Sequence, residues 1–244
     1  MRNLIKAENL KLQHTFGGKI SFIAPCIMLL LAFVLTGGLG DAFPAGTWNW
    51  WYSLFLSGTL SIGCYLSIKK DKKLKYHNLL LLNILPQKSW IAKIIHCAWG
   101  LLISNIIIYM GTLFGGALLG TTISVFGGLS AVFLLTIAYL WEIPLFLFLS
   151  ARFGMFISVF FSVILSVSGI ITVSDSSFWW LYPAAIPVRL MCPALGLLPN
   201  GLPVPVGSEL GNTNVILPGV VLSVAWFLIF GAATSIWFAH WEEK

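Results

Sequence analysis

The sequence predicts an all-α integral membrane protein with six transmembrane helices, and composition is the first reason. Of its 244 residues, 58% are hydrophobic and 9% are Asp, Glu, Lys or Arg, whereas an average soluble domain spends about a quarter of its residues on charge. The mean hydropathy is +0.92. The second reason is that uncharged runs of about 20 residues, enough for one helical crossing, recur along the chain. A soluble enzyme, a disordered tail and a secreted disulfide scaffold are excluded, and residues 1–244 are expected to form one membrane domain.

Cysteine, histidine and net charge predict no metal, cofactor or nucleic acid for this chain. The four cysteines and four histidines are scattered, without the paired spacing of a disulfide framework or a metal motif. The formal charge of +6 comes from basic residues beside apolar runs. Such residues normally mark the cytoplasmic side of a membrane and contact anionic lipid headgroups.

The first 19 residues predict an amphipathic helix that lies in the inner membrane interface. Apolar residues such as Leu4 and Leu12 are interleaved with basic ones, and Gly17 and Gly18 allow the chain to turn into the membrane. Glu8 is the only acidic residue here; it could pair with Lys6, Lys11 or a partner, although a solvated carboxylate is the more common outcome.

Charge-free runs define the first two crossings, at residues 20–40 and 51–68, the second ending at Lys69. Four aromatic residues near the start of the second crossing are expected at the outer interface: Trp48, Trp50, Trp51 and Tyr52. The long uncharged stretch 94–141 is broken by glycines near 115–128 and predicts two helices, at about 91–118 and 128–149. Residues 153–173 and about 216–240 supply the fifth and sixth.

Residues 174–214 contain six prolines among apolar residues, which rules out one continuous spanning helix. Short helices that lie on the outer leaflet or re-enter it are predicted, and an ordinary long loop is the alternative.

Positive charge orients the predicted helices with both termini in the cytoplasm of a plasma membrane. In this orientation 13 of the 14 lysines and arginines fall inside and only Arg189 falls outside, as the positive-inside rule requires. The inside residues are Arg2, Lys6, Lys11, Lys19, Lys69, Lys70, Lys72, Lys73, Lys75, Lys88, Lys93, Arg152 and Lys244.

The cytosolic loop at residues 69–89 is the strongest candidate for a functional surface. A basic block is followed by a leucine run that a merely solvated loop has no reason to carry, so a docking helix for a cytosolic partner is predicted. A simple positive-inside cluster remains the alternative. The docking residues are Lys72, Lys73, Leu74, Lys75, Tyr76, His77, Asn78, Leu79, Leu80, Leu81 and Leu82.

Glu142 is the only acidic residue deep inside a predicted span, where it needs a polar partner or a water-filled cavity. A structural hydrogen bond to another helix and a transport role are equally compatible with its position. No phosphate-binding G-x-x-x-x-G-K-[ST] motif, H-E-x-x-H motif or G-x-S-x-G motif occurs, so no enzymatic activity is predicted.

The order of several short segments resembles the lantibiotic-immunity permeases, a group of type-2 ABC exporter membrane subunits that includes the epidermin, mutacin and nisin self-protection proteins of Gram-positive bacteria. The resemblance covers essentially the whole chain. It is carried by LIKAENLKLQHTF (4–16), IAPCIMLLLAF (23–33), NWWYSLFLSG (49–58), KKLKYHNLLLLNILPQKSWIAKII (72–95) and WWLYPAAIPVRLMCPALGLLPNG (179–201).

This resemblance implies a permease that pairs with a second, similar permease or with itself, and with two copies of a cytosolic ATPase that binds ATP and Mg²⁺. The docking helix would seat in the ATPase, and hydrolysis would expel the peptide antibiotic from the membrane. Substrate contact, or a structural role, is expected for Glu142, Asp41, Trp50, Trp51, Trp179, Trp180 and Arg189.

The sequence is compatible with two other functions. An immunity protein that binds the peptide without ATP would need no docking helix, and an intramembrane enzyme would depend on Glu142.

Overall fold

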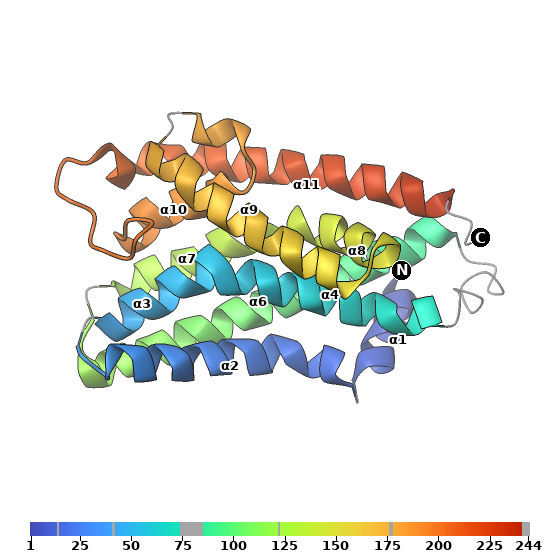
Figure 1. Ribbon diagram of the computed structural model, residues 1–244, viewed down its shortest axis with the longest axis horizontal. Coiled ribbons are helices and arrows are strands. Elements are labelled where there is room, and N and C mark those ends of the chain that lie inside the picture. Colours follow the sequence, from blue (N-terminus) through green and yellow to red (C-terminus); the bar gives the residue numbers. More distant parts are fainter. Residues whose placement is uncertain (14, 41, 74–84, 122, 176–177, 241–244) are drawn as a thin grey trace.

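The computed structural model describes residues 1–244 apart from 14, 41, 74–84, 122, 176–177 and 241–244. It confirms the all-α prediction: 84% of the structure is helical, and the described residues form no strand beyond an isolated bridge between Leu197 and Pro203. Long apolar helices lie side by side in one elongated bundle (Figure 1). The fold is therefore that expected of a helical membrane protein, whose backbone polar groups must be satisfied within each helix.

Within the described residues, four helices are long and apolar enough to cross a membrane: α2, α6, α9 and α11. Their bounds are Phe16–Thr36, Pro86–Leu119, Met155–Asp175 and Ile216–Ala239. The other α-helices are α1 (Arg2–Leu12), α3 (Ala42–Trp50), α4 (Leu56–Lys73), α7 (Val125–Tyr139), α8 (Glu142–Arg152) and α10 (Ala185–Leu195). The described part of the chain also contains the short helical turns η1 (Trp51–Phe55), η2 (Trp179–Leu181), η3 (Glu209–Gly211) and η4 (Thr213–Val215).

Helix ends follow local sequence signals. Helix α2 stops at Gly37, which adopts the left-handed conformation with φ of 61° that glycine tolerates best. Pro86 opens α6, where its missing N–H costs nothing. The Ser124 side chain accepts a hydrogen bond from the Gly127 amide at the start of α7.

Helices α7 and α8 meet at a bend of 45° and together make a fifth candidate span. Pro144 is the third residue of α8. Because proline has no backbone N–H, it cannot donate the hydrogen bond to the preceding turn that would make α7 and α8 one continuous helix. The bend places Glu142 in the first turn of α8, where helix amide groups favour negative charge.

The prediction of six spans is not confirmed, because the second predicted crossing is not a single apolar helix. Helices α3 and α4 run in line through the π-helical turn η1, and the eighteen residues of α4 end in a charged stretch from Lys69 to Lys73. A π turn leaves a backbone carbonyl without its usual helical partner, and here the Tyr139 hydroxyl donates a hydrogen bond to the Tyr52 carbonyl.

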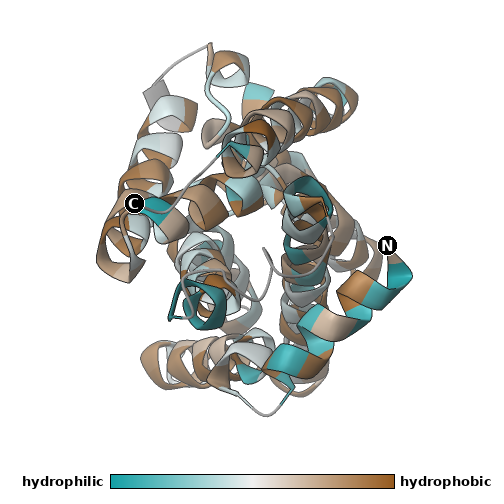
Figure 2. Ribbon diagram, turned by 90° about the vertical axis from the view of Figure 1, so that its right-hand side faces the viewer, coloured by the Kyte–Doolittle hydropathy of each residue, from teal (hydrophilic) through white to brown (hydrophobic). Residues whose placement is uncertain are grey.

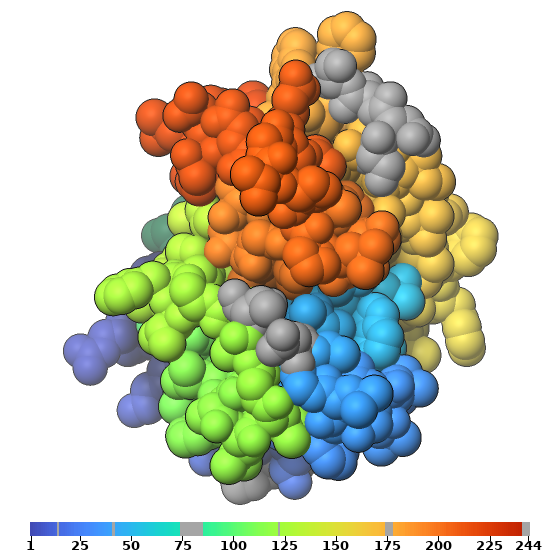
Figure 3. Space-filling view, turned by 90° about the vertical axis from the view of Figure 1, so that its left-hand side faces the viewer, coloured from blue at the N-terminus to red at the C-terminus, as the bar shows by residue number. Residues whose placement is uncertain are grey.

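Within residues 174–214, α10 is a core element rather than a surface helix. Nine of its eleven residues are buried, and it packs against α7 and α9. The sequence predicts short helices that lie on the outer leaflet or re-enter it, but it does not predict that α10 is buried among the other helices, because proline content alone gives no information about burial. The segment from α10 to α11 also covers much of one end of the bundle (Figure 3).

We predict that Gly169→Ala destabilises the contact between α9 and α10. An added Cβ at Gly169 would lie 2.4 Å from the Ala184 carbonyl oxygen, so the two backbones must separate, at a cost of about 1 to 3 kcal/mol. The matched control is Gly231→Ala in α11, whose Cβ would meet nothing within 4 Å. Thermal unfolding in detergent should show a lower midpoint for the first variant alone, and equal midpoints would contradict this packing.

Candidate functional site: the basic end of the bundle

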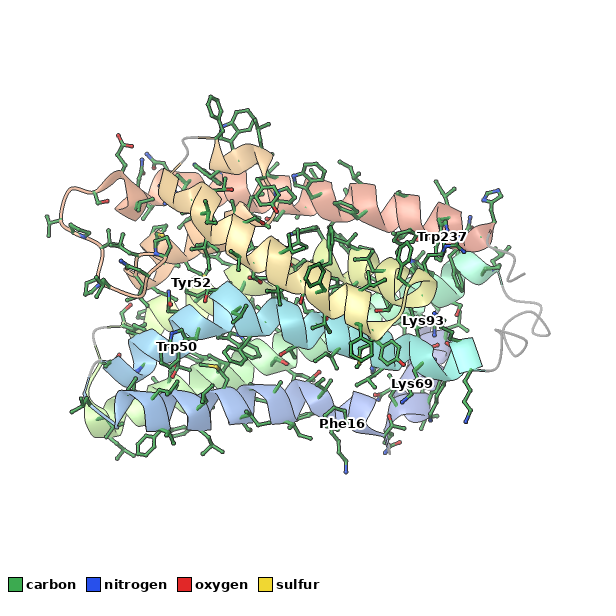
Figure 4. The ribbon with its side chains drawn as sticks, viewed as in Figure 1. Phe16, Trp50, Tyr52, Lys69, Lys93 and Trp237 are labelled. Atoms are coloured by element: carbon green, nitrogen blue, oxygen red, sulfur yellow. The ribbon has the colours of Figure 1, made fainter. Side chains whose placement is uncertain are left out.

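Basic residues gather at one end of the bundle. Helix α1, the start of α2, the end of α4, the start of α6 and the end of α8 meet there (Figure 1). Arg189 excepted, every lysine and arginine in the described part of the chain belongs to one of these element ends. Figure 2 looks onto this end and shows the hydrophilic residues of α1 against apolar helices. The view with side chains places Lys93 and Lys69 here, away from Trp50 and Tyr52 (Figure 4).

Lys93, near the start of α6, is the organising residue of this end. Its side chain is 0% exposed, and its ammonium group contacts Glu8 Oε1 at 2.8 Å and Asp71 Oδ2. Burying an unpaired ammonium group would cost much free energy of folding, so Lys93 can be buried only because these two carboxylates contact it.

Lys11 completes a cluster of two cations and two anions. Its Nζ lies 2.5 Å from Glu8 Oε2 and 2.9 Å from Asp71 Oδ2. We call Glu8, Lys11, Asp71 and Lys93 the ionic cluster. It carries no net charge when all four groups are ionised, and it joins α1, α4 and α6. The Lys70 ammonium adds a bond of 2.6 Å from α4 to the Lys11 carbonyl.

The ionic cluster was only partly predictable from the sequence. The sequence permits pairing of Glu8 with Lys11 but favours a solvated Glu8, and that expectation is wrong because the residue is buried. Asp71 and Lys93 were missed as partners. A signal was present: Asp71 is the only acid within the basic stretch 69–75, and Lys93 directly precedes a long uncharged run.

The electrostatics of Asp71 and Lys11 follow from this geometry, and both residues lie outside the apolar spans. Burial by itself would raise the pKa of Asp71, but the ammonium groups of Lys93 and Lys11 outweigh it and hold the pKa below its ordinary value of 3.8. Burial, followed by repulsion from Lys93, lowers the pKa of Lys11 despite its carboxylate partners. Asp71 therefore stays ionised at neutral pH.

The predicted docking helix begins beside the ionic cluster. Lys72 donates a hydrogen bond of 2.8 Å to the Ala151 carbonyl, which ties the end of α4 to the end of α8. Lys73 is exposed. The remaining docking residues fall outside the described residues: Leu74, Lys75, Tyr76, His77, Asn78, Leu79, Leu80, Leu81 and Leu82. The described residues on either side of this segment are Lys73, the last residue of α4, and Leu85, directly before α6. Asp71 of the ionic cluster lies two residues before Lys73, and Lys93 lies eight residues after Leu85.

Glu142 lies in the middle of the bundle, apart from the ionic cluster. It is 2% exposed, and its Oε2 accepts a hydrogen bond of 2.8 Å from the Ser57 hydroxyl of α4. The sequence is compatible with a structural hydrogen bond or a transport role for Glu142, and the contact seen is a hydrogen bond to another helix.

At the opposite end, the predicted substrate residues form two separate groups. Arg189 is 5% exposed and donates hydrogen bonds of 2.6 and 2.7 Å to the carbonyls of Leu210 and Glu209. Its guanidinium lies 5.7 Å from the ring centroid of Trp179, a cation–π distance. Trp180 is exposed.

The second group belongs to α3 and η1. The Trp51 indole donates a hydrogen bond of 2.9 Å to Asn105, whereas Trp50 is half-buried. Asp41 lies outside the described residues. The contacts of Arg189 and Trp51 are therefore made within the protein, and they hold the elements at this end together.

Neither a search for metal-ligating groups nor comparison with known proteins assigns a function to this site. The residues that the structure describes contain no group of three or more His, Cys, Asp or Glu side chains that could hold a metal ion. No family model, curated protein or solved structure matches the chain.

We predict that Lys93→Met destabilises the protein by about 3 kcal/mol, because Glu8 and Asp71 are then left buried with Lys11 as the one remaining cation among their described partners. The exposed control Lys69→Met should stay within about 0.5 kcal/mol of the parent. The double variant Lys93→Met/Asp71→Asn should recover part of the loss, since the unmatched charge is removed. Thermal unfolding and limited proteolysis of residues 1–19 measure these effects; additive losses in the double variant would argue against the pairing.

Acid should weaken the attachment of α1 through Asp71. The pKa of this group is lower in the folded protein than its ordinary 3.8, so its stabilising contribution is complete above that pH and is lost as the pH falls through the folded pKa. The contribution of Asp71 to the free energy of unfolding should therefore be constant from pH 7 down to about pH 4 and should decrease at lower pH. Asp71→Asn should remove that part of the decline; an unchanged acid profile in the variant would refute the assignment.

Proposed function

We propose that this chain is the membrane subunit of an ABC exporter that expels a lantibiotic from the membrane of a Gram-positive producer cell. The ionic cluster, which joins the end of α4 before the docking segment to α6 after it, is the observation that supports it most. A partner that pushes on this segment can move the bundle only if the segment is attached firmly. The attachment consists of the bond from Lys72 to Ala151 and the contacts of Lys93 with Asp71 and Glu8.

In this proposal the basic end faces the cytoplasm and the chain crosses the membrane six times. The in-line helices α3, η1 and α4 together supply the crossing that neither α-helix provides alone. The side-by-side course of this rod and the apolar helices supports that count (Figure 1). The orientation follows the positive-inside rule.

The chain itself carries out no bond chemistry in this proposal. Two copies of a separate ATPase hold ATP and Mg²⁺, and a second permease, or another copy of this chain, completes the pathway. The cationic peptide approaches from outside, so its first contact is the outer end formed by α3, η2 and the segment after α10. Trp180 is exposed there and offers an aromatic surface to a membrane-inserted peptide.

Charge reversal in the docking segment tests the transporter mechanism. We expect Lys73→Glu/Lys75→Glu to abolish both co-purification of an ATPase and protection of the cell, because the basic start of the docking helix becomes acidic. Lys72 is left intact because it bonds to Ala151. The matched control is Lys19→Glu/Arg152→Glu, which changes the same charge at exposed positions of the same end.

The measurement is purification of the tagged chain from its native host, mass identification of what accompanies it, and survival of cells challenged with the peptide. A P-loop ATPase bound by the parent and the control, and lost in the docking variant, is the expected result. A chain that purifies alone and still protects cells depleted of ATP would refute the transporter and leave the ATP-independent immunity protein.

A further inference from the structure

A large cavity lies between α1, α2, α4 and α6, next to the ionic cluster. Its volume is about 840 Å³, within the range of about 300 to 1,000 Å³ typical of small-molecule sites. Most of its inner wall is apolar and comes from the three longer helices, with Ile20, Leu56, Leu60 and Leu101 among the contributing residues. A hydrocarbon chain is the chemistry that this wall accommodates.

Helix α1 gives the cavity a polar and cationic edge. Arg2, Lys6, Asn9 and Gln13 line it, and their spacing of three to four residues places them on one face of the helix. Glu8 lies on a different face and points into the ionic cluster. The described residues that line it include Arg2, Lys6 and His96 but no aspartate or glutamate. The edge therefore favours an anion.

Exposed aromatic residues mark where the cavity reaches the outside of the bundle. Phe22 of α2 and Trp99 of α6 both line it and are 52% and 59% exposed. The outer surfaces of these two helices are apolar and suited to contact lipid tails. A ligand can thus reach the cavity sideways from the bilayer, and need not pass through water.

We propose that this cavity binds one anionic phospholipid, with its phosphate at Arg2 and Lys6 and an acyl chain along Ile20, Leu60 and Leu101. Basic pockets between membrane helices at the cytoplasmic surface suit such headgroups. The two cations on α1 are exposed and outside the ionic cluster, so they are free to meet a phosphate. This site does not depend on transport activity and adds a lipid ligand to the chain.

The proposal is tested with purified full-length chain carrying a C-terminal tag. Protein in mild detergent is incubated with equal amounts of phosphatidylglycerol and phosphatidylcholine, separated from free micelles by gel filtration, and extracted for lipid counting by mass spectrometry. The parent should retain phosphatidylglycerol in preference to phosphatidylcholine. Arg2→Gln/Lys6→Gln should lower retained phosphatidylglycerol on the order of tenfold or more. The control Lys19→Gln/Lys88→Gln removes equal charge from exposed positions that do not line the cavity and should change retention less than about twofold.

A second variant tests the cavity itself. Gly63 lines it, and an added Cβ there would meet only Ile20 Cγ2, at 3.8 Å, so Gly63→Leu fills space without a forced clash at its Cβ. Retained phosphatidylglycerol should fall, while Gly231→Leu, at an open position of α11, should leave it unchanged. Equal retention of the two lipids by the parent, equal losses in the two charge variants, or full retention in a folded Gly63→Leu protein would each overturn the proposal.

Discussion

The buried ammonium of Lys93 sets the arrangement of the whole basic end. A charge with 0% side-chain exposure is tolerated only with anionic partners close by. Those partners come from two other elements, Glu8 on α1 and Asp71 on α4. Satisfying one lysine of α6 therefore requires α1 to lie across the end of the bundle and α4 to reach it. Lys11 balances the second carboxylate charge, so that the group as a whole can be buried.

The same requirement acts on polar groups in the apolar middle of the bundle, where hydrocarbon offers no hydrogen-bond partner. Hydroxyls such as that of Thr112 bond to a carbonyl one turn earlier in their own helix. Asn105 accepts a bond from Trp51 and donates one of 3.1 Å to Thr136, so it links three elements. Glu142 is held by Ser57. The interior is thus specified by a few polar contacts between helices, while apolar side chains cover the outside.

Sequence alone predicted the elements whose geometry hydrophobicity dictates. Residues 20–40, 153–173 and 216–240 were expected to be helical, and the structure has helices at 16–36, 155–175 and 216–239, because an uncharged run of membrane length has essentially one stable conformation. The π turn at Trp51, the burial of α10 and the ionic cluster were not predicted. Each depends on contacts between segments far apart in the chain, such as that of Lys93 with Glu8. The hydrophobic periodicity of a single helix does not predict such contacts.

Helix α1 contributes to both the ionic cluster and the cavity, through two different faces. One face carries Glu8 and Lys11, which hold it to α4 and α6; the other carries Arg2 and Lys6 along the cavity between α2 and those same helices. A displacement of α4 relative to α6 strains the contact of Lys93 with Asp71, and α1, which contacts both helices, must then either lose a contact or move. In either case the cavity wall changes shape, since α1, α4 and α6 all contribute to it. A lipid seated there would fill the space into which these helices could collapse, so its binding energy would add to that of the ionic cluster in holding the end of the docking segment in place.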